Sequence, residues 1–183
     1  MKQALLIVDI QNDYFPGGKM ALVGMEDAAK NAQRVLGLFR AGNLPIFHIQ
    51  HVSNRAGATF FLPETDGVEI HERVTPKHGE YIIQKHFPNS FRDTSLNDQL
   101  QTLNVGEVII CGAMTHVCID TTVRAAFDLG YRCLVVSDAC ATRNLQFGGI
   151  AIEAPQVHAA FMAALSSFFA RVVETNNLES QLG

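Results

Sequence analysis

Short apolar runs alternate along the chain with longer segments in which polar and apolar residues are mixed. The runs are rich in β-branched residues and are bounded by turn-forming residues, which predicts strands that are covered on both faces. These predicted strands are residues 4–8, 44–50, 81–85, 108–111 and 133–136. A further run at residues 171–173 predicts a strand at an edge of the sheet.

The mixed segments predict helices. Residues 26–41 repeat apolar side chains at helical intervals, and Gly42 follows them as a helix stop. Thr115 is placed to cap a helix that ends at Gly130, and Pro155 suits the first turn of a last helix. The predicted helices are residues 26–41, 94–103, 115–130 and 155–169. The polar tail after residue 176 has no predicted element.

Strands and helices therefore alternate along most of the chain. This order predicts an α/β fold with three α/β/α layers around a mostly parallel, Rossmann-like sheet of five to six strands. The chain has 183 residues, 48% of them hydrophobic and 17% charged, so we expect one domain that spans residues 1–183. Residues 53–79 show no period. So long a connection in a compact domain is usually functional or a covering loop.

Charge and cysteine content narrow the possible partners. The net charge of -4, with no block of like charges, argues against a nucleic-acid surface. The run at 4–8 is too short for a signal peptide or a membrane span. The cysteines match no zinc-binding spacing, so free thiols in a reducing compartment are expected; they are Cys111, Cys118, Cys133 and Cys140. We expect a cytoplasmic protein with no nucleic-acid or membrane partner.

One cysteine has the setting of a nucleophile. Residues 108–122 predict a strand, a turn at Gly112 and a helix whose first turn holds Cys118. Unpaired N–H groups and the positive end of the helix dipole favour the thiolate there. The alternative is that Cys118 is a small buried hydrophobic residue, as free cysteines usually are.

Two further reactive side chains follow other predicted strands. Asp9 and Lys85 each stand at the carboxyl end of a strand, as Cys118 does. Parallel strands bring their carboxyl ends to one edge, so the three side chains are predicted to converge. Lys85 would stabilise a thiolate, and Asp9 would accept the thiol proton and deliver it to a leaving group. Alternatively, Asp9 caps its loop and Lys85 is solvated.

The ordered set of motifs resembles the isochorismatase-like cysteine hydrolases, a superfamily that includes nicotinamidases and N-carbamoylsarcosine amidohydrolases. The resemblance covers nearly the whole chain. It is carried by residues 8–13 with Gly17 and Gly18, by Lys85 with Phe87 and Phe91, by residues 112–118 with Thr121 and Thr122, and by residues 137–140.

The resemblance implies a catalytic triad of Asp9, Lys85 and Cys118. It also implies a cis peptide bond between Ala113 and Met114, with the N–H groups of Met114 and Cys118 forming an oxyanion hole. The implied substrate is a small molecule with an amide, carbamoyl or ureido C–N bond. Cys118 would attack its carbonyl, an amine or ammonia would leave, and water would hydrolyse the thioester.

Five residues are candidate substrate contacts. Tyr14 stands where the family often places an aromatic residue, and Phe60 and Phe61 either close over the substrate or belong to the core. Gln11 is a further candidate that could instead buttress the triad. His116 lies near Cys118, but Asp9 already fills the base role, so a structural role is the alternative.

The predicted cofactor content is none, and no metal is expected. Family nicotinamidases carry an Asp-x-His pair after the second strand, whereas this chain has His48 and His51 there without the Asp, and His71 lies farther on. Isochorismatases that cleave a vinyl ether generally lack the nucleophilic cysteine, so Cys118 argues against that reaction. Two alternatives stay open: a non-catalytic scaffold or thiol sensor, and a nicotinamidase. The resemblance and the apolar last helices imply a homo-oligomer.

Overall fold

The computed structural model describes residues 1–182, with side chains as far as Leu178. Its centre is a six-stranded parallel sheet in the order β3-β2-β1-β4-β5-β8. The strands are β1 Lys2–Val8, β2 Ile46–His51, β3 Tyr81–Lys85, β4 Val105–Ala113, β5 Arg132–Ala141 and β8 Arg171–Val173. The predicted parallel sheet and its edge strand are confirmed.

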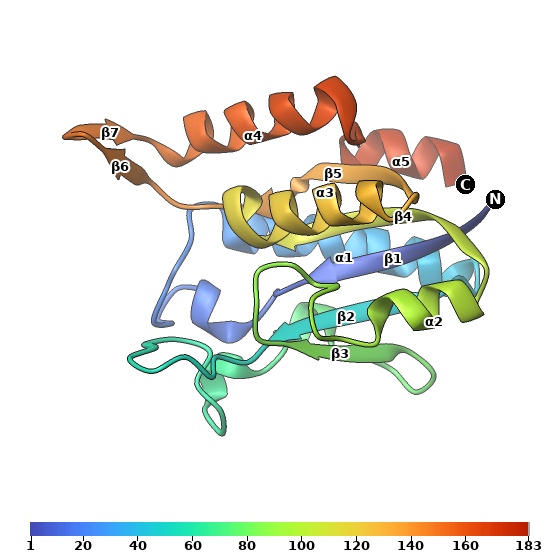
Figure 1. Ribbon diagram of the computed structural model, residues 1–183, viewed down its shortest axis with the longest axis horizontal. Helices are drawn as coiled ribbons and strands as arrows, with labels where there is room; N and C mark the ends of the chain where they lie inside the picture. The colour runs from blue at the N-terminus through green and yellow to red at the C-terminus, as the bar shows by residue number, and fades with distance from the viewer. Residues whose placement is uncertain (183) are drawn as a thin grey trace.

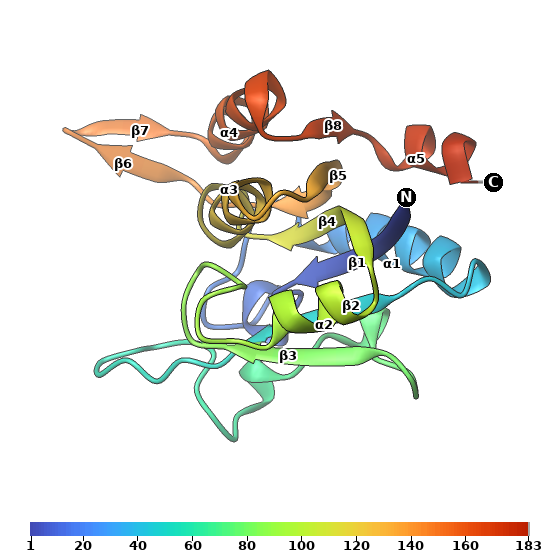
Figure 2. The same cartoon turned by 45° about the vertical axis from the view of Figure 1, so that its right-hand side comes forward.

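Helices cover both faces of this sheet (Figure 1, Figure 2). Alternate residues of β1 point to opposite faces: Leu5 and Ile7 belong to one apolar core, and Leu6 and Val8 to the other. The first core includes residues of α1 and α5, and the second includes residues of α2, α3 and α4. The helices are α1 Met25–Ala41, α2 Leu96–Thr102, α3 Asp120–Asp128, α4 Ala154–Phe168 and α5 Thr175–Leu182. The predicted three-layer α/β/α architecture is therefore correct.

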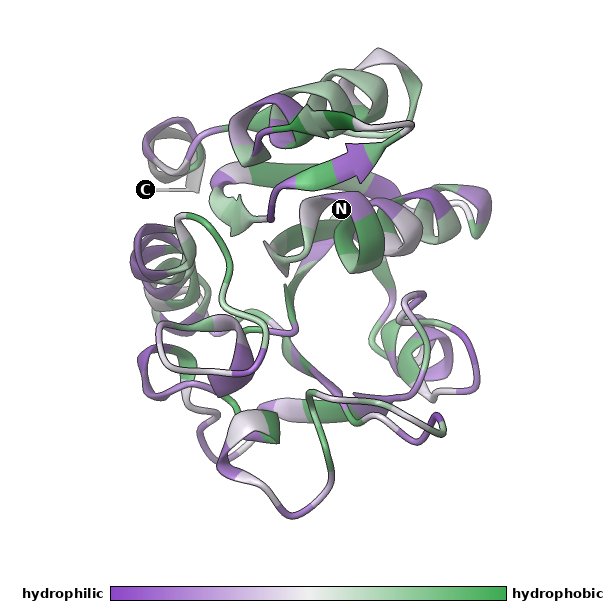
Figure 3. Ribbon diagram, turned by 90° about the vertical axis from the view of Figure 1, so that its left-hand side faces the viewer, coloured by the Kyte–Doolittle hydropathy of each residue, from purple (hydrophilic) through white to green (hydrophobic). Residues whose placement is uncertain are grey.

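The hydropathy of the ribbon follows these layers. In Figure 3 the strands at the centre are mostly hydrophobic, whereas the helices carry hydrophobic and hydrophilic stretches in alternation. This is the pattern expected of a sheet buried on both faces and of helices buried on one side.

Some elements differ from the prediction. The polar tail forms α5, and β6 Leu145–Phe147 pairs with β7 Ile150–Ile152 in an antiparallel hairpin that projects from the body (Figure 1). Thr115 does not cap a helix. Met114 takes that position, and Thr115 lies inside a single π-helical turn, Thr115–Ile119, that leads into α3. Its hydroxyl donates instead to the carbonyl of Ala141 at 3.2 Å.

The sheet brings three strand ends to one place. In the register of β1, Val8 pairs with Ile49 of β2 on one side and with Gly112 of β4 on the other. His51 at the end of β2 pairs with Lys85 at the end of β3. The residue that follows β1 is therefore flanked by the ends of both neighbouring strands.

Candidate active site

Asp9 is held at the centre of this edge by the backbone. It follows β1 with a φ of 52°, its N–H donates to the carbonyl of Ile49 at 3.0 Å, and its side chain is fully buried. On the other side, Gly112 has a φ of 125°, and a Cβ there would lie 1.9 Å from the carbonyl oxygen of Val8. Only glycine permits this approach of β4 to β1. The carboxylate is thus fixed beneath the carboxyl edge of the sheet.

Lys85 pairs with this carboxylate. Its Nζ lies 2.9 Å from Oδ2 of Asp9, and the ammonium also donates to the carbonyl of Pro88 at 3.0 Å. Burial lowers the pKa of Lys85, but the Asp9 charge and the contacts with Asp9 and Cys118 outweigh burial, and the net effect is a raised pKa. Lys85 is therefore an ammonium ion at neutral pH, although its side chain is buried.

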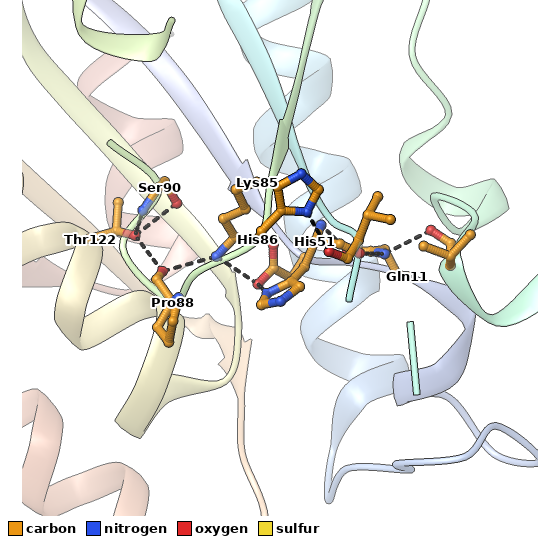
Figure 4. A network of polar contacts seen from close by, with 10 residues as sticks. Gln11, His51, Lys85, His86, Pro88, Ser90 and Thr122 are labelled. Atoms are coloured by element: carbon orange, nitrogen blue, oxygen red, sulfur yellow. Dashed lines mark hydrogen bonds and ion pairs between the residues drawn. The ribbon is translucent and has the colours of Figure 1, made fainter. Parts of the chain in front are cut away.

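The turn after β3 is itself anchored to α3. The Ser90 hydroxyl lies 2.8 Å from that of Thr122, and the Ser90 N–H donates to the same oxygen. Figure 4 shows Lys85 between this anchored turn, with Pro88, on one side and His51 and Gln11 on the other. The position of the ammonium is thus set by both neighbouring segments.

Cys118 lies beside the pair. Its sulfur, a carboxylate oxygen of Asp9 and a ring nitrogen of His51 all lie within 4.8 Å of one another. The pKa of Cys118 is raised to about 12, first by burial and then by the Asp9 charge, and Lys85 opposes them only in part. The expected preference for a thiolate is therefore wrong. The helix terminus cannot offset the loss of water and the adjacent carboxylate.

The Asp9 carboxylate lies among three polar groups. Its Oδ2 lies 2.9 Å from the Lys85 ammonium and 3.9 Å from Nδ1 of His51, and the Cys118 sulfur is close by. Apart from the Lys85 ion pair, neither carboxylate oxygen has a hydrogen-bond partner among the described residues. The carboxylate therefore has lone pairs available for the hydrogen of the adjacent thiol.

A cavity of about 440 Å³ opens above these groups. Both Met114 and Cys118 line it, and the peptide bond between Ala113 and Met114 is cis, as the resemblance implies. The other lining residues are Tyr14, His51, Ser53, Asn54, Arg55, Ala58, Phe60, His86, Phe87, Pro88 and Val117. This volume and mixed lining suit a small organic molecule with a few polar groups.

The cavity includes two of the five candidate substrate contacts, Tyr14 and Phe60. Phe61 is instead a core residue with no exposed surface, and its ring packs 4.6 Å from that of Tyr14. Gln11 is also outside the lining. Its amide donates to the carbonyls of His51 and Val68 and accepts from the His51 N–H, so it supports the end of β2. His116 is turned toward Thr142 Oγ1, at 2.6 Å from its Nδ1, and does not line the cavity.

Several lining residues were missed by sequence reasoning. The sequence offers His51 only as a metal ligand, it marks residues 53–79 as a functional loop without naming a contact in it, and it points to Phe87 only through the family resemblance. Pairing the ends of β2 and β3 in register would have placed His51 beside Lys85, because neighbouring parallel strands end together. The irregular segment 53–58 offered no comparable signal.

Two other features of this region do not have the chemistry of the site. A second cavity of about 870 Å³ lies between residues 12–19 and 59–75, but neither Asp9, Lys85 nor Cys118 lines it. Among the described residues, Asp9, His51 and Cys118 are the one trio spaced to hold a metal ion. They fit a cation poorly, because the Lys85 ammonium already lies 2.9 Å from the same carboxylate.

Comparison with known proteins identifies the family. A family model described as the isochorismatase domain matches residues 3–177. The chain belongs to the isochorismatase family. It is 53% identical over 175 residues to the isochorismatase family protein YddQ of Bacillus subtilis, with 96% of this chain and 97% of that protein covered. The resemblance predicted from the motifs is confirmed, and the protein is an isochorismatase-like hydrolase.

A solved structure supports the same assignment. The structure of an isochorismatase hydrolase from Oleispira antarctica is 48% identical and superposes with a TM-score of 0.94, covering 98% of this chain and 96% of that one. A more distant relative in this isochorismatase family is the ureidoacrylate amidohydrolase RutB of Acinetobacter baylyi, 24% identical over 207 residues, with 95% and 81% of the two chains covered.

No helix in the described part of the protein is long and apolar enough to cross a membrane.

Proposed function

We propose that this isochorismatase-family hydrolase cleaves the C–N bond of a small amide, carbamoyl or ureido compound through a thioester on Cys118. The observation that carries the proposal is the buried Asp9–Lys85 ion pair at 2.9 Å, next to a thiol that lines a cavity of about 440 Å³. The name of the RutB relative, an amidohydrolase, supports the class of bond.

The raised pKa of Cys118 sets the order of events. The resting nucleophile is a thiol, so its proton passes to the Asp9 carboxylate as the sulfur attacks the carbonyl carbon. Lys85 stabilises the sulfur and the carboxylate during this transfer. The backbone N–H groups of Met114 and Cys118 stabilise the developing oxyanion, where one such donor contributes about 10²–10³ in rate.

The proton then leaves with the product. As the tetrahedral intermediate collapses, the C–N bond breaks and Asp9 returns the proton to the departing nitrogen, which leaves as ammonia or an amine. The acyl group stays on the sulfur as a thioester. Water then breaks the C–S bond, releases the acid and regenerates the Cys118 thiol.

The burial of Cys118 also bears on the thiol-sensor alternative. Redox-sensing cysteines have a low pKa and are accessible to solvent. Cys118 is 3% exposed and its pKa is about 12, which disfavours a sensor. Two alternatives remain, a non-catalytic scaffold and a nicotinamidase. Because nicotinamide is an amide of the proposed class, both alternatives are tested in the same assay.

The proposal is tested by substituting the sulfur. C118A is expected to abolish ammonia release from a panel of amides, carbamoyl compounds and ureido acids that includes nicotinamide. The matched control is C133A, which removes another buried thiol whose sulfur contacts the carbonyls of Val123 and Tyr131 away from the cavity. The control is expected to keep its activity. Turnover by C118A at the rate of the unaltered protein would refute the nucleophile.

A further inference from the structure

His51 is a half-buried imidazole that the proposed reaction leaves without a role. It ends β2, its side chain is 16% exposed, and its ring lines the cavity beside Cys118. Both backbone groups of His51 are fixed by Gln11: the N–H donates to Oε1 at 2.8 Å, and the carbonyl accepts from Nε2 at 2.9 Å. The backbone segment that carries the ring is therefore held in place by Gln11.

The ring faces the reactive carboxylate. Its Nδ1 lies 3.9 Å from Oδ2 of Asp9. The ring itself makes no hydrogen bond with the described residues; only the backbone of His51 does, with Gln11. The tautomer that carries the proton on Nδ1 is favoured, because Nδ1 faces the Asp9 carboxylate. The lone pair is then on Nε2, at the opposite side of the ring.

The imidazole is also in the state that a base requires. Burial lowers the pKa of His51 below 6.5, and the charges of Lys85, His86 and Arg55 act in the same direction against that of Asp9. The ring is therefore neutral at pH 7 and able to accept a proton. Cys118, which carries the acyl group at this stage, bears no charge as a thioester.

We propose that His51 positions the water that hydrolyses the thioester and accepts a proton from that water. This proposal rests on the function proposed above. The water oxygen bonds to the thioester carbonyl carbon as Nε2 accepts one water proton. The C–S bond breaks, the acid leaves, and the sulfur recovers its proton from the His51 imidazolium. Atoms and charges balance: a thioester and water give an acid and a thiol.

Other polar groups of the cavity suit this task less well. His86 is exposed and its Nδ1 is engaged with the carbonyl of Val52 at 2.7 Å. The pKa of Tyr14 is raised well above 10, mainly by burial, so its hydroxyl keeps its proton. Lys85 is an ammonium ion and has no lone pair to offer.

The test separates the two half-reactions with p-nitrophenyl acetate, which acylates a reactive thiol and releases coloured p-nitrophenolate. The unaltered protein is expected to turn over steadily. H51N is expected to give a first burst of p-nitrophenolate and then a steady rate about 100-fold lower, because a positioned base contributes about 10²–10⁴. Intact-protein mass spectrometry is expected to show one acetyl group on Cys118. H78N, at an exposed histidine outside the cavity, is the matched control and is expected to show neither effect.

A pH profile gives an independent readout on the unaltered protein. Its deacylation rate is expected to be flat above pH 6.5 and to fall as His51 is protonated below that value; H51N is expected to lose this inflection. The ionisable groups that face His51 are Asp9, Lys85, Cys118, His86 and Arg55, so the H86N profile is recorded in parallel. If H51N fails to fold, H51Q and the unaltered protein's profile decide.

The outcomes distinguish this inference from the proposed function. If H51N turns over without accumulating acetyl enzyme, or if its burst and steady rates fall together, the role of His51 is refuted while Cys118 stands. If C118A shows the same burst, or if the acetyl group that accumulates on H51N is also found on H51N/C118A, the nucleophile itself is refuted.

Discussion

At the scale of single residues, the site depends on two buried opposite charges. Asp9 and Lys85 have 0% and 1% exposure, and each compensates the other where water does not reach. A buried ion pair adds little net stability, but removal of one partner leaves an unpaired buried charge. The reactivity of Cys118 depends on the same pair, because Asp9 raises and Lys85 lowers its pKa.

A double substitution separates these two effects. K85M is expected to lower the free energy of unfolding by about 3–5 kcal/mol, because it leaves the Asp9 charge unpaired. The variant D9N/K85M, which removes both charges, is expected to recover most of that stability and no activity. Urea unfolding and the ammonia assay measure the two properties. Equal instability of the single and double variants would contradict a charge effect.

At the scale of elements, the close approach of β4 to β1 places the Cys118 turn above Asp9. Gly112 makes this approach possible, because β4 bends there with a φ of 125° directly against the carbonyl of Val8. The register of the two strands shifts by a residue only at their other end, between Lys2 and Gln3. The site is thus built on a rigid pair of central strands.

G112A is expected to destabilise the protein by roughly 3 kcal/mol or more, because its Cβ has no room and its backbone angle is strained. The matched control is G37A in α1, where a Cβ meets nothing within 4 Å. Replacing a helical glycine by alanine is expected to stabilise by about 0.5–1 kcal/mol. Thermal unfolding of both variants checks the prediction. Equal melting temperatures for the two would mean that β4 can move away from β1.

At the scale of the whole molecule, one polar cluster ties a covering helix to the sheet. Arg40 of α1 donates from Nε and from an Nη to Glu80, at 2.7 and 3.0 Å. The Nε2 of His48 in β2 lies 2.8 Å from the same carboxylate. Burial raises the pKa of Glu80, but the hydrogen bonds from Arg40, Lys77 and His48 outweigh it and lower the pKa to about 2.

This cluster predicts a loss of stability in acid. The pKa of Glu80 is lower in the folded chain than the ordinary 4.5. Its contribution to the free energy of unfolding is therefore complete above pH 4.5 and is lost as pH falls toward 2. The urea midpoint is expected to fall over that range, and E80Q is expected to show a shallower fall. E64Q, at an exposed loop carboxylate, is the control and is expected to follow the unaltered protein. An unchanged slope in E80Q would refute the assignment.

The assembly of the molecule stays a prediction. The homo-oligomer and the cytoplasmic location inferred from the sequence are not tested by the fold. The hairpin of β6 and β7 carries Phe147 and Ile150 with 82% and 67% of their surfaces exposed, next to the apolar helix α4 that suggested self-association.

The order of apolar runs and mixed segments predicts the alternation of strands and helices, and hence the parallel sheet. Because parallel strands end at one edge, the sequence also predicts that Asp9, Lys85 and Cys118 come together. These conclusions follow from local periodicity and from one rule of topology.

Tertiary structure alone decided the state and the surroundings of these groups. Burial beside Asp9 keeps the proton on Cys118, and long-range packing removes Gln11, Phe61 and His116 from the cavity while it brings in His51. Desolvation and contacts between distant segments depend on the complete fold, so no local pattern of residues encodes them.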